Sequence, residues 1–133
     1  MYLPDTSAWN RSTRAFDRWE RMVEAGQLAV CAPVTLELLY SAQSRRNYRL
    51  LSFVLGRLPR LPLDPRAAAA AARTQRLLAE KSQHRGPKPI DLLVAAIAEV
   101  NGATLLHYDR HFDAIGRVSG QPMEWLAPRG SLD

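Results

Sequence analysis

The chain has 133 residues, with 18 Lys or Arg against 13 Asp or Glu, a formal net charge of +5 and a pI near 10.0. This length predicts one domain over residues 1–133 and excludes two independent cores. The single cysteine, Cys31, excludes a disulfide-rich secreted scaffold and indicates a cytoplasmic protein. No apolar run approaches the roughly 18 residues of a membrane span, so we expect no membrane partner.

Short apolar runs alternate with longer helical patterns along the chain. Helices are predicted around residues 16–25, from Pro33 onward, and over 45–55, 65–83, 89–100 and 109–115. Strands are predicted at the N-terminus up to Asp5 and over 28–32, 61–63, 104–107 and 122–126, although Pro62 interrupts the third of these. This alternation predicts an α/β fold in which helices cover both faces of a mostly parallel sheet of four to five strands.

The positive charge is concentrated in the middle of the chain. Residues 45–85 hold ten basic and two acidic residues, whereas both flanking segments are slightly acidic. A basic stretch of this kind indicates an anionic partner such as nucleic acid.

Four acidic residues stand out from the other charges. Asp5 ends the first predicted strand and Asp109 follows strand 104–107, so both lie at the carboxyl edge of a parallel sheet, where ligands collect. Asp91 lies in the first turn of an apolar helix, and Glu37 lies at the border of an apolar helix face. Each acid also has a structural alternative. The two strand-end residues could cap helices, the helical aspartate could pair with an arginine, and the glutamate could reach solvent.

Taken together, the four acids predict a site for a divalent cation. Clustered carboxylates repel one another and raise each other's pKa unless a multivalent cation neutralises them. Oxygen ligands without cysteine or paired histidine favour Mg²⁺ or Mn²⁺ over zinc.

Four motifs occur in an order and spacing that resemble a known family. They are residues 5–8 (DTSA), 34–38 (VTLEL), 89–96 (PIDLLVAA) and 107–113 (HYDRHFD). Over residues 1–115 the chain resembles the PIN-domain ribonucleases, and most of all the bacterial toxins of the VapC type. The resemblance implies a single PIN-like domain with a three-layer α/β/α fold and a metal site at the carboxyl edge of the sheet. It also implies Mg²⁺- or Mn²⁺-dependent endonucleolytic cleavage of RNA, homodimerisation, and inhibition by a small partner antitoxin (VapB-like).

The resemblance also implies which residues form the site. It makes Asp5, Glu37, Asp91 and Asp109 the catalytic acidic quartet, with Asp5, Asp91 and Asp109 as metal ligands. Either Thr6 or Ser7 matches the small hydroxyl residue that supports the quartet by hydrogen bonds.

The chain departs from the family pattern at three positions. The position two residues beyond Asp109 is acidic in many relatives and is His111 here, while Asp113 is acidic but shifted. Whether Asp113 or His111 takes part, and whether one metal or two bind, is therefore open at this point. Pro4 cannot donate to a strand ladder, so it fits only the end of its strand.

The proposed reaction is hydrolysis of RNA, and two other interpretations compete with it. In the hydrolytic interpretation the basic residues follow the RNA backbone, and Arg85 and Lys88 are expected nearest the site. The residues expected to bind RNA are Arg45, Arg46, Arg49, Arg73, Arg76, Arg85 and Lys88. One alternative is a metal-independent ribonuclease that uses His84, His107 and His111 and is active in EDTA. The other is a non-catalytic nucleic-acid or protein-binding module on the same fold.

Overall fold

The computed structural model describes residues 1–133, and its elements follow the predicted alternation of strands and helices. The three strands are β1 (Tyr2–Pro4), β2 (Thr104–His107) and β3 (Met123–Trp125). The helices are α1 (Thr6–Trp9), the 3₁₀ helix η1 (Ser12–Ala15), α2 (Phe16–Glu24), α3 (Ala32–Tyr40), α4 (Arg45–Gly56), α5 (Pro65–Glu80), α6 (Pro89–Val100) and α7 (His111–Ser119). None of these helices is long and apolar enough to cross a membrane.

The sheet is parallel, with strand order β1-β2-β3 and β2 in the centre. It has three strands rather than the predicted four to five. The predicted strand 28–32 forms only single-residue bridges, from Leu28 to Tyr2 and from Val30 to Arg60. Pro59 and Pro62 lie beside the second bridge and have no N–H to donate, which explains why pairing there does not extend into a ladder.

Both faces of the sheet are buried. The main core lies on one face and includes Leu3, Leu105 and Phe112, while a smaller cluster around Leu106 and Leu126 lies on the other. Neighbouring residues of β2 therefore face opposite layers, as the period of two in a strand requires. The three-layer α/β/α arrangement predicted from the sequence is thereby confirmed.

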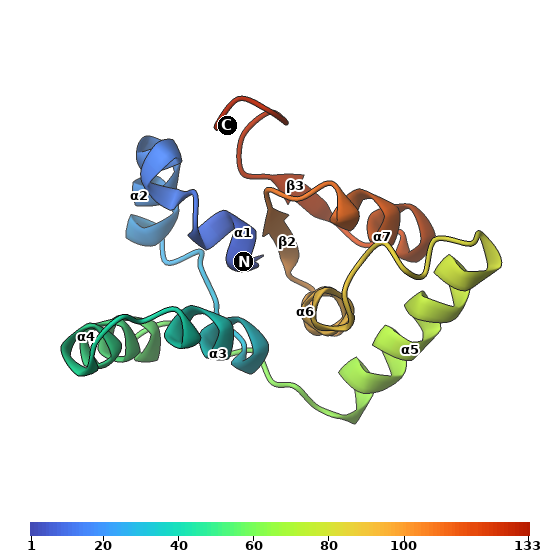
Figure 1. Cartoon of the computed structure of the whole chain (residues 1–133), viewed down its shortest axis with the longest axis horizontal. Helices are drawn as coiled ribbons and strands as arrows, with labels where there is room; N and C mark the ends of the chain where they lie inside the picture. The colour runs from blue at the N-terminus through green and yellow to red at the C-terminus, as the bar shows by residue number, and fades with distance from the viewer.

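The helices are distributed unevenly around the sheet. Figure 1 shows α4 at one end of the long axis of the molecule and α5 at the opposite end, with β2 and α6 between them. Helix α5 packs along α6 and α7. The basic stretch 45–85, which looks continuous in the sequence, is thus divided between opposite ends of the fold.

Pro4 is the last residue of β1 and pairs with Leu106. The next residue, Asp5, continues the hydrogen bonding to β2, because its N–H donates to the carbonyl oxygen of Leu106 at 3.0 Å. The proline therefore costs the sheet no hydrogen bond, and the chain turns directly into α1 at the carboxyl edge.

Candidate active site

Asp5 and Ser7 join the ends of β1 and β2. Ser7 Oγ donates to Asp5 Oδ1 at 2.6 Å and accepts from the N–H of Tyr108 at 2.8 Å. Asp5 also caps α1 through the N–H of Ala8 and is only 6% exposed. The hydroxyl of Ser7 thus fixes a buried carboxylate against the chain that leaves the neighbouring strand.

Thr6 makes the corresponding contact to α3. Its Oγ1 donates to Glu37 Oε1 at 2.7 Å. Glu37 itself is exposed, on the edge of a helix whose buried side includes Val34 and Leu38. The sequence left Thr6 and Ser7 as alternatives for one supporting role, whereas in the structure each hydroxyl holds a different acid.

Asp91 lies at the start of α6, where Pro89 occupies the first helical turn. Asp91 Oδ2 accepts from the backbone N–H of Lys88 at 2.9 Å, so the carboxylate also caps the helix. The residue is half-buried rather than enclosed by the apolar helix face. Its structural alternative, an arginine partner, is absent, because no ion pair involves this carboxylate.

Asp109 follows β2 and leads into α7. Its Oδ1 accepts from the N–H of His111 at 3.0 Å, and its own N–H donates to Nδ1 of His107 at 3.2 Å. Both bonds hold the turn in place and leave the second carboxylate oxygen of Asp109 without a hydrogen-bond partner in the protein. A capping role therefore accounts for only one of the two carboxylate oxygens of Asp109.

One cleft of about 200 Å³ is lined by all four acids. They reach it from four separate segments: the end of β1, helix α3, the first turn of α6 and the end of β2. The cleft is also lined by Thr6, Ser7, Asn10, Arg11, Lys88, Ile90 and His111. The fold therefore brings together every acid that the sequence singled out.

The electrostatics of the cleft favour binding of a cation. Burial raises the pKa of Asp5 to about 7, although the Ser7 hydroxyl and backbone N–H groups act in the opposite direction. Burial also raises the pKa of Asp91, where the Lys88 N–H opposes the shift and the charges of Asp109 and Glu37 add to it. Bringing positive charge into the cleft would relieve both effects.

The chemistry of the donors fits a hard divalent ion. Carboxylate and hydroxyl oxygens dominate the cleft, and Cys31 is buried elsewhere in the core. In the arrangement seen here no three His, Cys, Asp or Glu side chains form a ready-made metal site.

Asp113 is not part of this cleft. Its Oδ1 accepts from the indole N–H of Trp125 at 3.0 Å and lies 3.9 Å from Nε2 of His107. His111, by contrast, does line the cleft. Of the two residues left open by the sequence, the structure brings only the histidine next to the quartet.

Most of the expected RNA-binding residues, Arg85 among them, do not line the acidic cleft. Arg45, Arg46 and Arg49 lie on α4, and Arg73 is paired with Glu99 at 2.6 Å. Of the seven expected residues only Lys88 lines the cleft.

The three histidines do not form a common site. His107 is 1% exposed and packs between the rings of Phe112 and Trp125. Its burial lowers its pKa and denies it access to RNA. Because His84 is exposed and outside the cleft, only His111 could contact a substrate there, so the geometry disfavours the histidine-based mechanism.

Several arginines near the acids were missed from the sequence. Arg11 lines the cleft and lies over the ring of Tyr108, with 4.7 Å between its guanidinium carbon and the ring centroid. Arg110 and Arg129 line an adjoining hollow of about 320 Å³ together with Asp109. The spacing of Arg11 one helical turn after Ser7, and the position of Arg110 beside a strand end, were signals that could have identified them.

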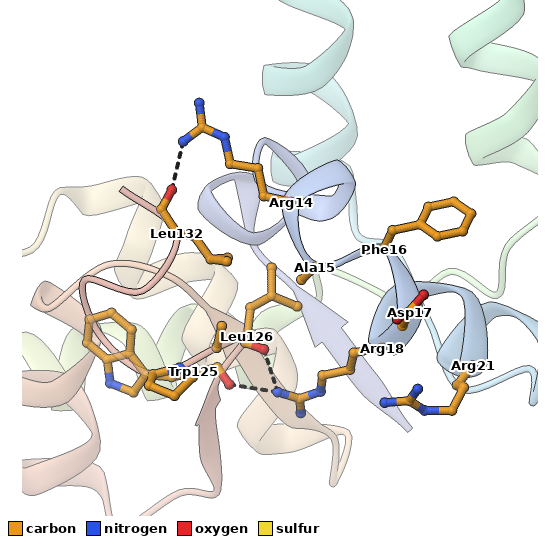
Figure 2. Close-up of a pocket in the computed structure, with 11 residues that line it drawn as sticks. Arg14, Ala15, Phe16, Asp17, Arg18, Arg21, Trp125, Leu126 and Leu132 are labelled. Atoms are coloured by element: carbon orange, nitrogen blue, oxygen red, sulfur yellow. Dashed lines mark hydrogen bonds between the residues drawn. The ribbon is translucent and has the colours of Figure 1, made fainter.

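A larger cavity of about 640 Å³ lies elsewhere, between η1, α2 and the residues that follow β3. Figure 2 shows that Arg14 and Arg18 point across it to backbone carbonyl groups of the C-terminal segment. The only carboxylate that lines it is Asp17. This cavity therefore lacks the cluster of acids that the metal-dependent mechanism needs.

Comparison with known proteins agrees with the motifs and the fold. The model of the PIN domain family matches residues 2–118. Ribonuclease VapC18 of Mycobacterium tuberculosis is 39% identical over 136 residues, with 99% of both chains covered. Ribonuclease VapC51 of the same organism is 40% identical over 134 residues, which cover 99% of this chain and 97% of that protein. Among solved structures, the DNA-bound VapBC of Salmonella typhimurium is similar in fold, with a TM-score of 0.77, 23% identity, and 95% and 98% of the two chains covered.

Proposed function

The chain belongs to the PIN-domain family, and from this membership and the acidic cleft we propose that it is a VapC-type endoribonuclease dependent on Mg²⁺ or Mn²⁺. The observation that carries the proposal is the convergence of Asp5, Glu37, Asp91 and Asp109 on one cleft from four separate segments. Full-length similarity to proteins named Ribonuclease VapC supports RNA as the substrate.

Asp5, Asp91 and Asp109 are the residues that would hold the metal, with Glu37 completing the acidic wall. The ion, when bound, supplies polarisation of the phosphoryl oxygen and a lower pKa for the attacking water. Ser7 holds Asp5 and Thr6 holds Glu37 by hydrogen bonds, so two of the carboxylates are oriented before RNA arrives. Because pre-set orientation lowers the cost of reaching the reactive geometry, these hydroxyls contribute to the rate.

Lys88 and Arg11 provide the positive charge of the cleft. Placed among the carboxylates, they offset the repulsion between the acidic wall and an incoming phosphodiester. Attack by water leaves the ribose 2′-OH unused, so the expected products carry 5′-phosphate and 3′-hydroxyl ends.

The proposed biological role is that of a toxin inhibited by a small VapB-like antitoxin. The similar solved structures include VapBC-5 of Mycobacterium tuberculosis, a member of the VapBC family of toxin-antitoxin systems, and the DNA-bound VapBC of Salmonella typhimurium, which supports this partner. The surface also suits assembly, including a homodimer, because Leu36, Tyr40 and Phe53 leave large apolar side chains exposed on α3 and α4.

Cleavage of labelled RNA by the purified protein tests the proposal. We expect cleavage with Mg²⁺ and with Mn²⁺, none in EDTA, and 5′-phosphate ends on the products. An Asp5→Asn variant should be inactive under all three conditions. Cleavage that persists in EDTA, or that yields 2′,3′-cyclic phosphates, would contradict the metal-dependent mechanism, and binding of RNA without cleavage would support a non-catalytic module instead.

A further inference from the structure

A second polar cavity, of about 500 Å³, adjoins the acidic cleft. It lies between the turn that follows α5, the first turns of α7 and the segment after β3, and His111 lines both this cavity and the cleft. A volume of this size accommodates a small ligand such as a nucleotide. A ligand bound in the cleft could therefore extend along α7 into this cavity.

Three arginines give this cavity a charge opposite to that of the cleft. Arg110, Arg117 and Arg129 line it, and all three are exposed. None of them makes an ion pair, in contrast to Arg18, Arg66 and Arg73 elsewhere in the molecule. We call this group of three residues and the cavity they line the arginine pocket.

The only carboxylate in the arginine pocket does not neutralise the guanidinium groups. Asp113 lines the pocket, but its Oδ1 accepts from the Trp125 indole and faces His107. The three guanidinium groups therefore remain available to an external anion. Guanidinium is the side-chain group best shaped to bind phosphate oxygens in pairs.

The arginine pocket and the hollow beside the acidic cleft share two lining residues. Arg110 and Arg129 line both the arginine pocket and the hollow that contains Ser7 and Asp109. A polyanion that places one phosphate among the acids would therefore find guanidinium groups along its next phosphates. A small isolated anion would occupy only one of the two hollows, so shared lining residues favour a polyanion.

We propose that the arginine pocket binds the RNA backbone at the nucleotide next to the one that is cut, through Arg110, Arg117 and Arg129. This inference rests on the proposed function, because it takes RNA as the substrate and the acidic cleft as the place of cleavage. It assigns to these residues the role that the sequence had suggested for the arginines of α4 and α5.

Salt-dependent binding of a fluorescent single-stranded RNA, measured by anisotropy in EDTA, tests the pocket without cleavage. The variant carries Arg110→Ala, Arg117→Ala and Arg129→Ala. The control carries Arg21→Ala, Arg57→Ala and Arg60→Ala, three exposed arginines that line neither the cleft nor the arginine pocket, with the same change in charge. Each phosphate contact on a single strand contributes about 0.7 to the slope of log K against log salt. We expect the pocket variant to lose a slope of about 2 and the control to keep the wild-type slope. Equal losses in both variants, or no loss in the pocket variant, would overturn the inference.

Cleavage kinetics separate this inference from the proposed function. The pocket variant should show a KM raised about tenfold or more with kcat nearly unchanged on a long RNA. On a substrate too short to supply a flanking phosphate, it should match the wild-type protein. If both proteins cleave the long RNA equally, the pocket inference fails and the proposed function stands. If the wild-type protein cleaves no RNA with either metal, the proposed function fails, and the binding slopes still decide whether the pocket contacts RNA.

Discussion

The larger of two cavities in this protein is not the one that carries the candidate active site. The cavity between η1, α2 and the C-terminal segment has a volume of about 640 Å³, against about 200 Å³ for the acidic cleft. In the larger cavity Arg18 donates to the carbonyl oxygens of Trp125 and Leu126 at 2.8 and 2.7 Å (Figure 2). Its charge already has partners within the chain and serves to fasten that segment.

In the acidic cleft each of the four carboxylates accepts a hydrogen bond from the chain, but these bonds do not neutralise its charge. No arginine is paired with any of the four carboxylates, and burial and mutual repulsion raise the pKa of two of them. Charge that the fold leaves unbalanced is a better marker of a working site than volume, because a protein pays for it in stability. The predictions below test this contrast between the two cavities.

The largest expected effect comes from removing one charge in each cavity. Asp91→Asn in the cleft keeps the shape of the side chain but removes a metal ligand, and we expect RNA cleavage to fall about 100-fold or more. Asp17→Asn, which changes the same atoms at an exposed residue of the larger cavity, should leave the rate unchanged. Single-turnover cleavage under saturating Mn²⁺ compares the two.

Equal losses in these two variants would mean that overall charge, rather than position in the cleft, governs activity. Thermal unfolding of both variants provides the control for folding.

The next effect concerns pH and Asp5. Its pKa of about 7 in the folded protein means that a proton competes with the metal below neutral pH. Mn²⁺ affinity should therefore rise about tenfold between pH 6 and pH 8, as measured by calorimetry. Asp5→Asn should abolish this rise, and an affinity independent of pH in the wild-type protein would contradict the role of Asp5.

The same shift has a consequence for stability. Because the folded pKa lies above the unfolded value of 3.8, the folded state binds the proton more tightly than the unfolded state. The metal-free protein should therefore lose stability as the pH rises from about 4 to 7. Asp5→Asn should flatten this part of the profile in urea unfolding.

A smaller effect is expected in the larger cavity. Arg18→Ala removes two hydrogen bonds to backbone carbonyls and a long contact to Glu124 at 3.7 Å. Since Arg18 is partly exposed, we expect a loss of about 1 kcal/mol and a fall in Tm of a few degrees. The cleavage rate below Tm should not change, and a loss of activity without a loss of stability would give this cavity a functional role.

Elements with local signals were predictable from the sequence. Helix α6 begins at Pro89 and ends at Val100 as expected, because a proline in the first turn and Asn101-Gly102 beyond the last turn act on their own neighbours. The bounds of β2 were predicted for a similar reason. The segment 28–32 was not, since pairing depends on which chain lies beside it, and there the neighbouring chain is rich in proline.

The candidate site likewise contains residues whose positions could be predicted from the sequence and residues whose positions could not. The convergence of Asp5 and Asp109 could be predicted because the carboxyl ends of parallel strands share one edge. The position of Arg129 beside the site could not, since it depends on long-range contacts, whereas Arg11 and Arg110 had local signals. Arg129 reaches the edge only because the segment after β3 folds back, where Tyr108 Oη contacts Asp133 and Leu132.

The smallest effect concerns the hydroxyl that holds Glu37. Thr6→Val keeps the shape of the side chain but removes the donor to Glu37 Oε1, and it frees a carboxylate that is exposed and already accessible to water. We therefore expect a loss of activity of only about twofold to threefold, with unchanged stability, because an exposed hydrogen bond exchanges readily with water. Thr6→Ser, which keeps the donor, should retain the wild-type rate in the same cleavage assay. A loss as large as that of Asp91→Asn would show that Glu37 must be held rigidly. The exposed Glu37 would then matter to activity as much as the more buried acids of the cleft.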